Sequence, residues 1–189
     1  PGANDDLSGV SMTLEAARLM ASKQWNATIK FVAFTGEEQG LLGSKALAAR
    51  AKAENWDVEA VLSSDIVGSS QNKLGQKDDQ HIRLFSEESD KHQGRELARF
   101  IEWQTRQSVK GFGVKLVFRR DRFGRGGDHT SFTAQDYAAV RFTEVFEEYA
   151  YQHTIDDLPE HMDFRYLANV TRVSLAALAS LADAGEPPT

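Results

Sequence analysis

Apolar residues near the start of the chain recur at helical spacing. The intervals between them alternate between three and four residues, which places them on one face of a helix. These positions are Leu7, Val10, Leu14, Ala17 and Ala21. The pattern predicts a helix over residues 7–22, following a Gly-containing start.

Short, nearly continuous apolar runs alternate with further helical patterns along the rest of the chain. Residues 29–34 are rich in β-formers, as expected of a strand covered on both faces of a parallel sheet. The other predicted strands are 58–67, 82–85, 114–118 and 138–142, and the other predicted helices are 41–53, 93–107 and 164–183.

This alternation predicts an α/β fold, a three-layer αβα sandwich with a mixed, mostly parallel central sheet. We expect one domain over residues 1–184 and a disordered tail over residues 185–189. The chain has 189 residues, of which 41% are hydrophobic and 26% are charged, the balance of one globular domain.

Charge and composition exclude several partners. A net charge of -6 argues against a nucleic-acid surface, and no apolar run reaches the roughly 20 residues of a membrane span. The chain contains no cysteine, so that oxygen and nitrogen atoms must hold any metal. A local exception to the acidic character is a loop that contains Arg119, Arg120, Arg122 and Arg125.

Acidic residues stand where such a sheet places functional sites, beyond the carboxyl ends of its strands. Glu37 and Glu38 follow the predicted strand 29–34, and Asp65 lies late in the predicted strand 58–67. Two adjacent glutamates can divide the labour of hydrolysis. One carboxylate can bind a metal while the other acts as a general base for the metal-bound water.

Loops supply the remaining candidates. Asp5 and Asp6 precede the first helix, and His153 follows the last predicted strand. Carboxylates with an imidazole suit a hydrolytic zinc site. Each element alone also has a structural explanation, because aspartates cap helices and turns and a loop histidine is commonly a surface residue.

Five segments in order carry a resemblance to a known family. They are PGANDDLSG, FVAFTGEEQGLLGS, LSSDIVG, GGDHTSF and HTIDD. The chain resembles the bacterial leucyl aminopeptidase family of zinc exopeptidases, metallopeptidase family 28, over nearly its whole length. The resemblance implies zinc-dependent removal of amino-terminal residues from a peptide substrate, in a secreted or periplasmic enzyme.

The resemblance also assigns roles to single residues. It makes Asp5 a carboxylate that bridges two zinc ions and Glu37 the general base. It implies that Glu38 and His153 hold one zinc ion and that Asp65 holds the other.

A further group is expected around the metals or at the substrate. Asp6 and Asp157 would orient ligands. Residues expected to border the substrate pocket are Asp128, His129, Glu144 and Tyr151, with Phe123 and the neighbouring arginines at its rim. The alternatives are a helix cap at Asp128 with His129 in the first turn, and a solvated basic loop.

The chain departs from the family at its start. The family's second zinc ion also takes a histidine from a His-x-Asp motif that would precede Pro1. We therefore expect two zinc ions in a complete site and one or none in this chain. The absent region would also supply sheet strands, so the hypothesis is a fragment of a longer enzyme.

Three other functions stay open. Asp5, Glu38 and His153 match the set of single-zinc glutaminyl cyclases, which transfer an acyl group. A carboxypeptidase or dipeptidase would share the zinc machinery. An inactive binding domain would lose metal ligands, which this chain retains.

Overall fold

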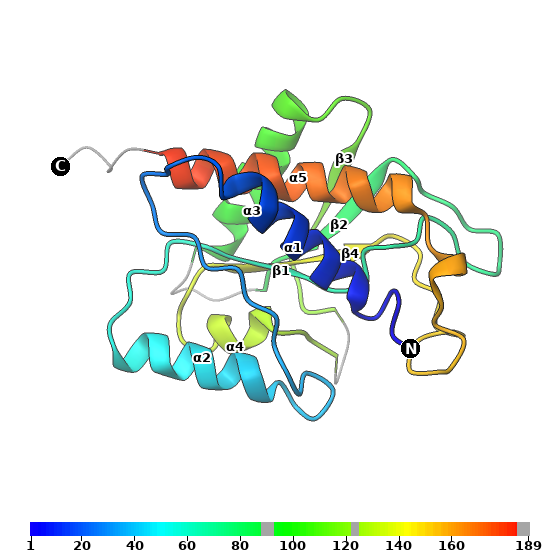
Figure 1. The fold of residues 1–189 in the computed structure, drawn as a ribbon, viewed down its shortest axis with the longest axis horizontal. Helices are drawn as coiled ribbons and strands as arrows, with labels where there is room; N and C mark the ends of the chain where they lie inside the picture. The colour runs from blue at the N-terminus through cyan, green and yellow to red at the C-terminus, as the bar shows by residue number, and fades with distance from the viewer. Residues whose placement is uncertain (88–92, 122–124, 185–189) are drawn as a thin grey trace.

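A computed structural model shows three layers (Figure 1) and describes residues 1–87, 93–121 and 125–184. The helical elements in the described residues are α1 (Leu7–Met20), α2 (Leu42–Ala53), α3 (Gly94–Ser108), α4 (His129–Thr133), the 3₁₀ turn η1 (Pro159–His161) and α5 (Phe164–Asp183). The strands there are β1 (Val61–Ser64), β2 (His81–Phe85), β3 (Gly113–Val117) and β4 (Ala139–Glu144). The predicted tail 185–189, Arg122 and Phe123 lie outside the described residues.

The strands form a mixed sheet in the order β1-β4-β2-β3. The β1–β4 and β2–β3 pairs are parallel, and β2 pairs with β4 in the antiparallel sense. This confirms the predicted mixed, mostly parallel sheet. Because Ser64 is in register with Phe142, the carboxyl ends of β1 and β4 lie at the same edge of the sheet.

Helices cover both faces of the sheet, which confirms the predicted three-layer αβα sandwich. α1 packs against β1 and α3 against β3 and β4, with α5 against α1 and α3. On the other face α4 contacts β1 and β4, and α2 packs on α4 (Figure 1).

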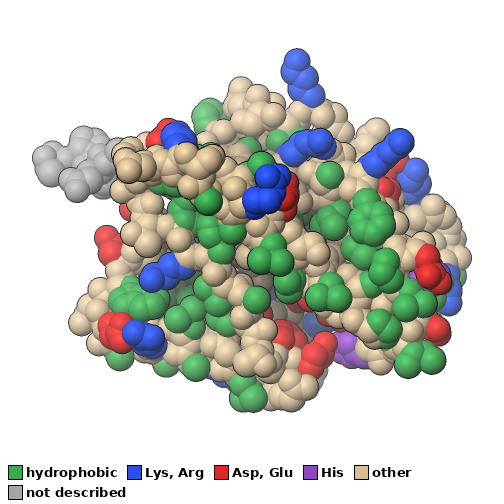
Figure 2. Space-filling model, viewed as in Figure 1, with side chains coloured by type: hydrophobic (Ala, Val, Ile, Leu, Met, Phe, Trp, Pro, Cys, Tyr) green, Lys and Arg blue, Asp and Glu red, His purple; other side chains and the backbone are tan. Residues whose placement is uncertain are grey.

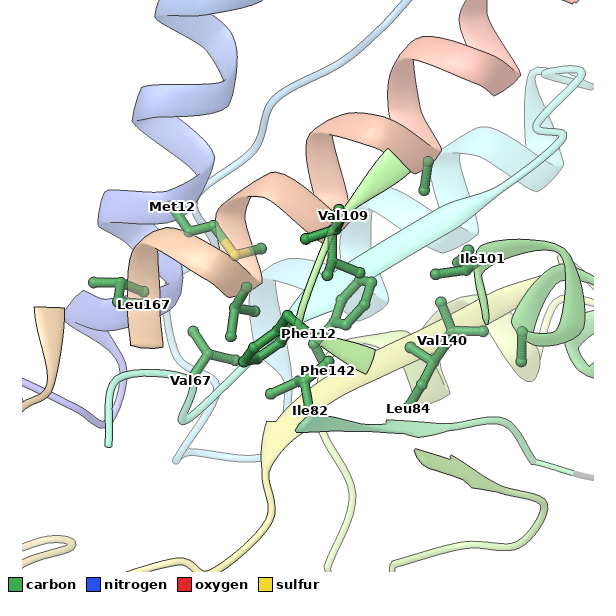
Figure 3. Close-up of a cluster of buried hydrophobic side chains, with 14 of the residues drawn as sticks. Met12, Val67, Ile82, Leu84, Ile101, Val109, Phe112, Val140, Phe142 and Leu167 are labelled. Atoms are coloured by element: carbon green, nitrogen blue, oxygen red, sulfur yellow. The ribbon is translucent and has the colours of Figure 1, made fainter. Parts of the chain in front are cut away.

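The main core lies between the sheet and the α1–α3–α5 layer (Figure 3). Ile82 and Leu84 of β2 and Phe142 of β4 have no exposed surface, and Met12 of α1 reaches the same cluster. Each large apolar side chain buried in this way contributes roughly 1.5–3 kcal/mol. This packing fixes the strands whose ends carry the polar groups.

The buried face of α1 is not its apolar stripe. Leu7 and Leu14 are 54% and 66% exposed. Hydrophobic and charged side chains are mixed on the face of the molecule that Figure 2 shows. The buried positions are Ser8, Gly9, Met12, Ala16 and Met20. A Cβ at Gly9 would lie 2.2 Å from the carbonyl oxygen of Ser64, so small residues let the helix approach β1 closely.

The prediction of a buried strand over residues 29–34 is wrong. The structure assigns no strand there, and Val32 is 39% exposed. β1 is the edge of the sheet and pairs with β4 among the described strands, and residues 29–34 do not pair with its free edge, so the run stays outside the sheet. The predicted strand 58–67 is also shorter, and Asp65 follows the last residue of β1 directly.

No helix within the described ranges is both long and apolar enough to cross a membrane.

Candidate metal centre

The loop before α1 is fixed by a residue far along the chain. Asp157 accepts hydrogen bonds through Oδ1 from the backbone N–H of Asn4 and through Oδ2 from that of Asp5, both at 2.9 Å. The backbone N–H of Ala3 donates to the carbonyl of Asp157 at 3.1 Å. Figure 1 shows this N-terminal loop beside the segment between β4 and α5. These contacts hold the main chain at Asp5 in place.

Asp6 links α1 to the end of β1. Its Oδ1 accepts from the backbone N–H of Gly9, which caps α1, and from that of Ile66, both at 3.1 Å. Burial, followed by the charge of Asp65, raises the pKa of Asp6 well above its ordinary range. Asp6 therefore has a structural role, because it joins the start of α1 to the chain after β1. Its predicted role in orienting ligands stays a prediction.

The Gly-Glu-Glu-Gln-Gly segment forms a tight turn. The carbonyl of Glu37 accepts from the backbone N–H of Gly40 at 2.9 Å and of Leu41 at 2.8 Å. Gly40 has a φ of 101°, a conformation that favours glycine. The turn presents two carboxylates, with Glu38 half exposed and Glu37 more enclosed.

His153 completes a cluster with two of these carboxylates. Its Nε2 lies 2.9 Å from Glu38 Oε1 and 3.1 Å from Asp5 Oδ2. The three candidate ligand atoms all lie within 4.8 Å of one another. The histidine is 65% exposed, so that the cluster opens to solvent. These residues share one pocket with Thr154 and Asp157.

The donor set fits a zinc ion. Two carboxylate oxygens and one imidazole nitrogen are ligands that zinc prefers, and catalytic zinc sites combine three protein ligands with an open position. The exposed side of the cluster provides room for that position. Without a cation, the two carboxylates beside the histidine nitrogen would concentrate negative charge at this site.

That negative charge shows in the acid–base behaviour of the site. Burial raises the pKa of Asp5 to about 6, with further contributions from the charges of Asp65 and Glu38. Burial raises the pKa of Glu37 to about 7, and the charges of Asp65 and Glu38 add to the effect. The Glu37 carboxyl is therefore able to gain and lose a proton near neutral pH.

Asp65 lies near this cluster but has its own partner. Its Oδ2 pairs with Arg141 Nη2 at 2.9 Å, and it does not join the three-ligand group of the described residues. Burial raises its pKa, against the lowering effect of Arg141 and Arg125. Its predicted role as a ligand of a second zinc ion stays a prediction.

Glu144 is fully buried at the end of β4. Its carboxylate accepts from Asn4 Nδ2 at 3.1 and 3.2 Å and from the backbone N–H of Ser69 at 2.7 Å. Burial raises its pKa to about 8. Because Asn4 precedes Asp5, Glu144 contacts the loop before α1, and its predicted place at the substrate pocket stays a prediction.

Asp128 and His129 begin the short helix α4. Asp128 stands at the N-cap position without a side-chain cap bond. His129 is 3% exposed, its Nε2 lies 3.7 Å from Glu87 Oε1, and burial lowers its pKa to about 3. His129 is therefore a neutral, enclosed residue.

Tyr151 was also expected to border the substrate pocket. Its ring stacks on that of His161, with ring centroids 4.0 Å apart.

The arginine-rich loop is largely neutralised where it is described. Arg120 pairs with Glu87 at 3.0 Å, and Arg125 contacts Asp121 and Glu147. Asn4, Arg141 and Glu147 were not among the residues predicted from the sequence. A signal was available, because charged residues interrupt the apolar run AAVRFTEVF, and such residues need partners when they are buried.

The fold and the donor set together define an α/β protein with a candidate metal centre built from two carboxylates and a histidine. The model of Peptidase family M28 matches residues 1–178, and the chain belongs to this family. It is 39% identical over 215 residues to a "probable zinc metalloprotease" of Leptosphaeria maculans, covering 100% of this chain and 50% of that protein. A second "probable zinc metalloprotease", of Pyrenophora teres f. teres, is 41% identical over 218 residues, covering 100% and 45%.

Solved structures show the same fold. The crystal structure of LapB from Legionella pneumophila matches with a TM-score of 0.80 and 27% identity, over 96% of this chain and 48% of that one. An aminopeptidase from Aneurinibacillus sp. strain AM-1 matches with a TM-score of 0.75 and 29% identity, over 100% and 42%. The chain spans about half the length of these relatives.

Proposed function

We propose that this chain forms the zinc-binding catalytic part of an aminopeptidase, which hydrolyses the amino-terminal residue from a peptide. The observation that carries the proposal is the convergence of Asp5 and Glu38 on Nε2 of His153. Membership of Peptidase family M28 and the fold of the Aneurinibacillus aminopeptidase support it.

Asp5, Glu38 and His153 would hold one zinc ion, and Asp65 with Asp5 would hold a second. When bound, zinc polarises a scissile carbonyl and lowers the pKa of water. We propose two zinc ions for a complete site. We also propose that the enzyme is exported from the cell.

Glu37 is the proposed general base. Its carboxyl lies close enough to Asp65 and Glu38 for their charges to raise its pKa, and it is not a member of the three-ligand cluster. It would accept a proton from the attacking water and return it to the leaving amine. A pKa of about 7 suits both transfers near neutral pH.

The test is the substitution Glu37→Gln, assayed with an aminoacyl anilide. We expect turnover to fall by at least a hundredfold, within the range that general acid–base catalysis provides, while bound zinc is unchanged. Gln39→Ala, at an exposed position in the same turn, is the matched control and should keep turnover. Normal turnover in Glu37→Gln would contradict the assignment of the base.

The direction of cleavage needs a separate comparison. A peptide with a free amino terminus and the same peptide acetylated at that terminus differ only in the group that an aminopeptidase recognises. We expect cleavage of the free peptide and none of the acetylated one. Equal cleavage of both, from the carboxyl end, would identify a carboxypeptidase instead.

A further inference from the structure

Arg141 is a buried cation at the back of the candidate metal centre. Its side chain is 1% exposed and extends from β4, an interior strand of the sheet. Nη2 pairs with Asp65 Oδ2 at 2.9 Å, and Nη1 donates to the carbonyl of Gly126 at 2.8 Å. A buried charge is costly unless it is paired and hydrogen-bonded, so this arrangement needs a reason.

The Asp65–Arg141 pair is the end of a chain of alternating charges. Arg141 Nη1 lies 3.4 Å from Asp121 Oδ2, and the same oxygen lies 3.3 Å from Arg125 Nη1. Arg125 then contacts Glu147, and Glu147 Oε1 lies 2.5 Å from Arg83 Nη2. Three carboxylates and three guanidinium groups thus balance one another below the surface.

The first two residues of the GGDHTSF segment close over the pair. Gly126 supplies the carbonyl that Arg141 binds. A Cβ on Gly127 would lie 3.1 Å from Arg141 Cδ and 3.3 Å from Asp65 Oδ2. The second glycine therefore allows the backbone to press on both members of the pair, a use of glycine that a larger residue would disturb.

The backbone of Asp65 is anchored by the same strand. Its N–H donates to the carbonyl of Phe142 at 3.2 Å, and its carbonyl accepts from Thr143 Oγ1 at 3.0 Å. β4 consequently holds the main chain of Asp65 through two neighbours and its side chain through Arg141. Few rotations are left to the carboxylate.

We propose that Arg141 is a positioning residue that fixes the Asp65 carboxylate for metal binding, with Asp121 and the Gly126–Gly127 backbone fixing Arg141 in turn. The proposal rests on the proposed function, because it takes Asp65 as a ligand. The competing explanation is that Arg141 only neutralises a buried carboxylate and has no effect on metal.

The first measurement tests the contact itself and needs no metal. Melting temperatures of the metal-free chain are compared for Arg141→Met, Asp65→Asn and the double variant. Each single variant already removes the Asp65–Arg141 contact, so the second substitution has no further contact to remove. We therefore expect the double variant to melt no more than about a degree below Arg141→Met, the non-additivity that is typical of residues in contact. Additive losses would overturn the proposal.

The second measurement is zinc affinity, by titration against a competing chelator, in the longer form of the enzyme that carries the expected His-x-Asp motif. We expect Asp65→Asn to remove the weaker zinc and Arg141→Met to weaken it by at least tenfold, as for loss of a group that orients a ligand. The tighter zinc should change less than twofold. Arg141→Lys should restore part of the loss, since it keeps the charge but not the two-pronged geometry.

Two further variants separate positioning from general damage. Asp121→Asn removes Arg141's other carboxylate without touching Asp65, and it should weaken the same zinc by a smaller factor even if Arg141→Met does not fold. Arg120→Met is the matched control, because this arginine pairs with Glu87 instead. It should leave both affinities unchanged.

The outcomes distinguish this inference from the proposed function. Loss of the weaker zinc in Asp65→Asn, with full retention in Arg141→Met and Asp121→Asn, would overturn the positioning role alone. Zinc binding that is unchanged in Asp65→Asn would overturn the positioning role and the assignment of Asp65 together.

Discussion

The carboxylate of Asp157 accepts a hydrogen bond from the backbone N–H of Asp5 at 2.9 Å. Its other oxygen accepts from the preceding residue, Asn4, at the same distance. The segment just after His153 therefore fixes the loop that supplies Asp5, and two ends of the chain build one site. The geometry of the three ligands depends on this link as well as on the ligands themselves.

The Asp157 link is tested by Asp157→Asn. An amide has one acceptor oxygen where the carboxylate has two, so one backbone N–H of the loop loses its partner. A buried donor left unpaired costs about 1–3 kcal/mol. We expect zinc affinity to fall by roughly tenfold and the melting temperature to fall as well, as measured by chelator competition and thermal unfolding.

Asp156→Asn provides the control for that measurement, because Asp156 is exposed and adjacent in sequence. It should leave both quantities within error of the original protein. Equal zinc affinity in Asp157→Asn and Asp156→Asn would show that the loop is held without the carboxylate.

The buried carboxyl of Glu144 predicts a pH dependence of stability. Burial raises its pKa from the ordinary 4.5 to about 8, so the folded state binds this proton more tightly than the unfolded state. The contribution to stability is therefore fully present below about pH 4.5 and is lost as pH rises through about 8.

Glu144→Gln removes this titration while it keeps an acceptor for the Ser69 N–H. The free energy of unfolding of the variant minus that of the original protein should increase as pH rises from 5 to about 8.5, so that the variant gains stability relative to the original protein. Urea unfolding at several pH values measures this difference. A difference that is constant over this range would show that Glu144 does not titrate as described.

The orientation of α1 leads to a pair of opposite expectations. Met12 is 3% exposed, whereas Leu14 is 66% exposed. Met12→Ala should lower the free energy of unfolding by about 2–5 kcal/mol, because it leaves a cavity in the core. Leu14→Ala, on the exposed side, should change it by no more than about 0.5 kcal/mol. Chemical denaturation of both variants measures the two free energies of unfolding. A larger decrease for Leu14→Ala than for Met12→Ala would contradict the assignment of the buried face.

Helical periodicity located helices well but did not determine which side of α1 is buried. The bounds of α5 agree with the prediction, those of α2 differ by one residue at one end, and those of α3 differ by one residue at each end. In α1 Leu7 and Leu14 are exposed, because close contact with β1 requires the small Ser8 and Gly9 on the buried face. Apolar spacing carries no information about such steric fit.

The wrong prediction of a strand over residues 29–34 has a related cause. The local sequence indicates a preference for an extended, apolar conformation. A strand also requires a neighbouring strand with which its backbone can form hydrogen bonds. Among the described strands β1 pairs with β4 alone, and residues 29–34 do not form a ladder on its free edge. The partner of a strand is a property of the whole fold.

The metal cluster was predictable because its members stand in ordered motifs. Asp5, Glu38 and His153 are far apart in sequence, and the structure brings them together. The supporting groups Asn4 and Arg141 were not predicted, because their roles depend on the contacts that they make with Glu144 and Asp65. Such contacts follow from strand register and have no local signature.

The most direct test of the central claim is the zinc content per chain after loosely bound metal has been removed, measured for the original protein and for His153→Ala. The account predicts at least one tightly bound zinc ion in the original protein and its loss in His153→Ala. No tightly bound zinc in the original protein, or an equal zinc content in both proteins, would contradict the assignment of Asp5, Glu38 and His153 as a metal centre.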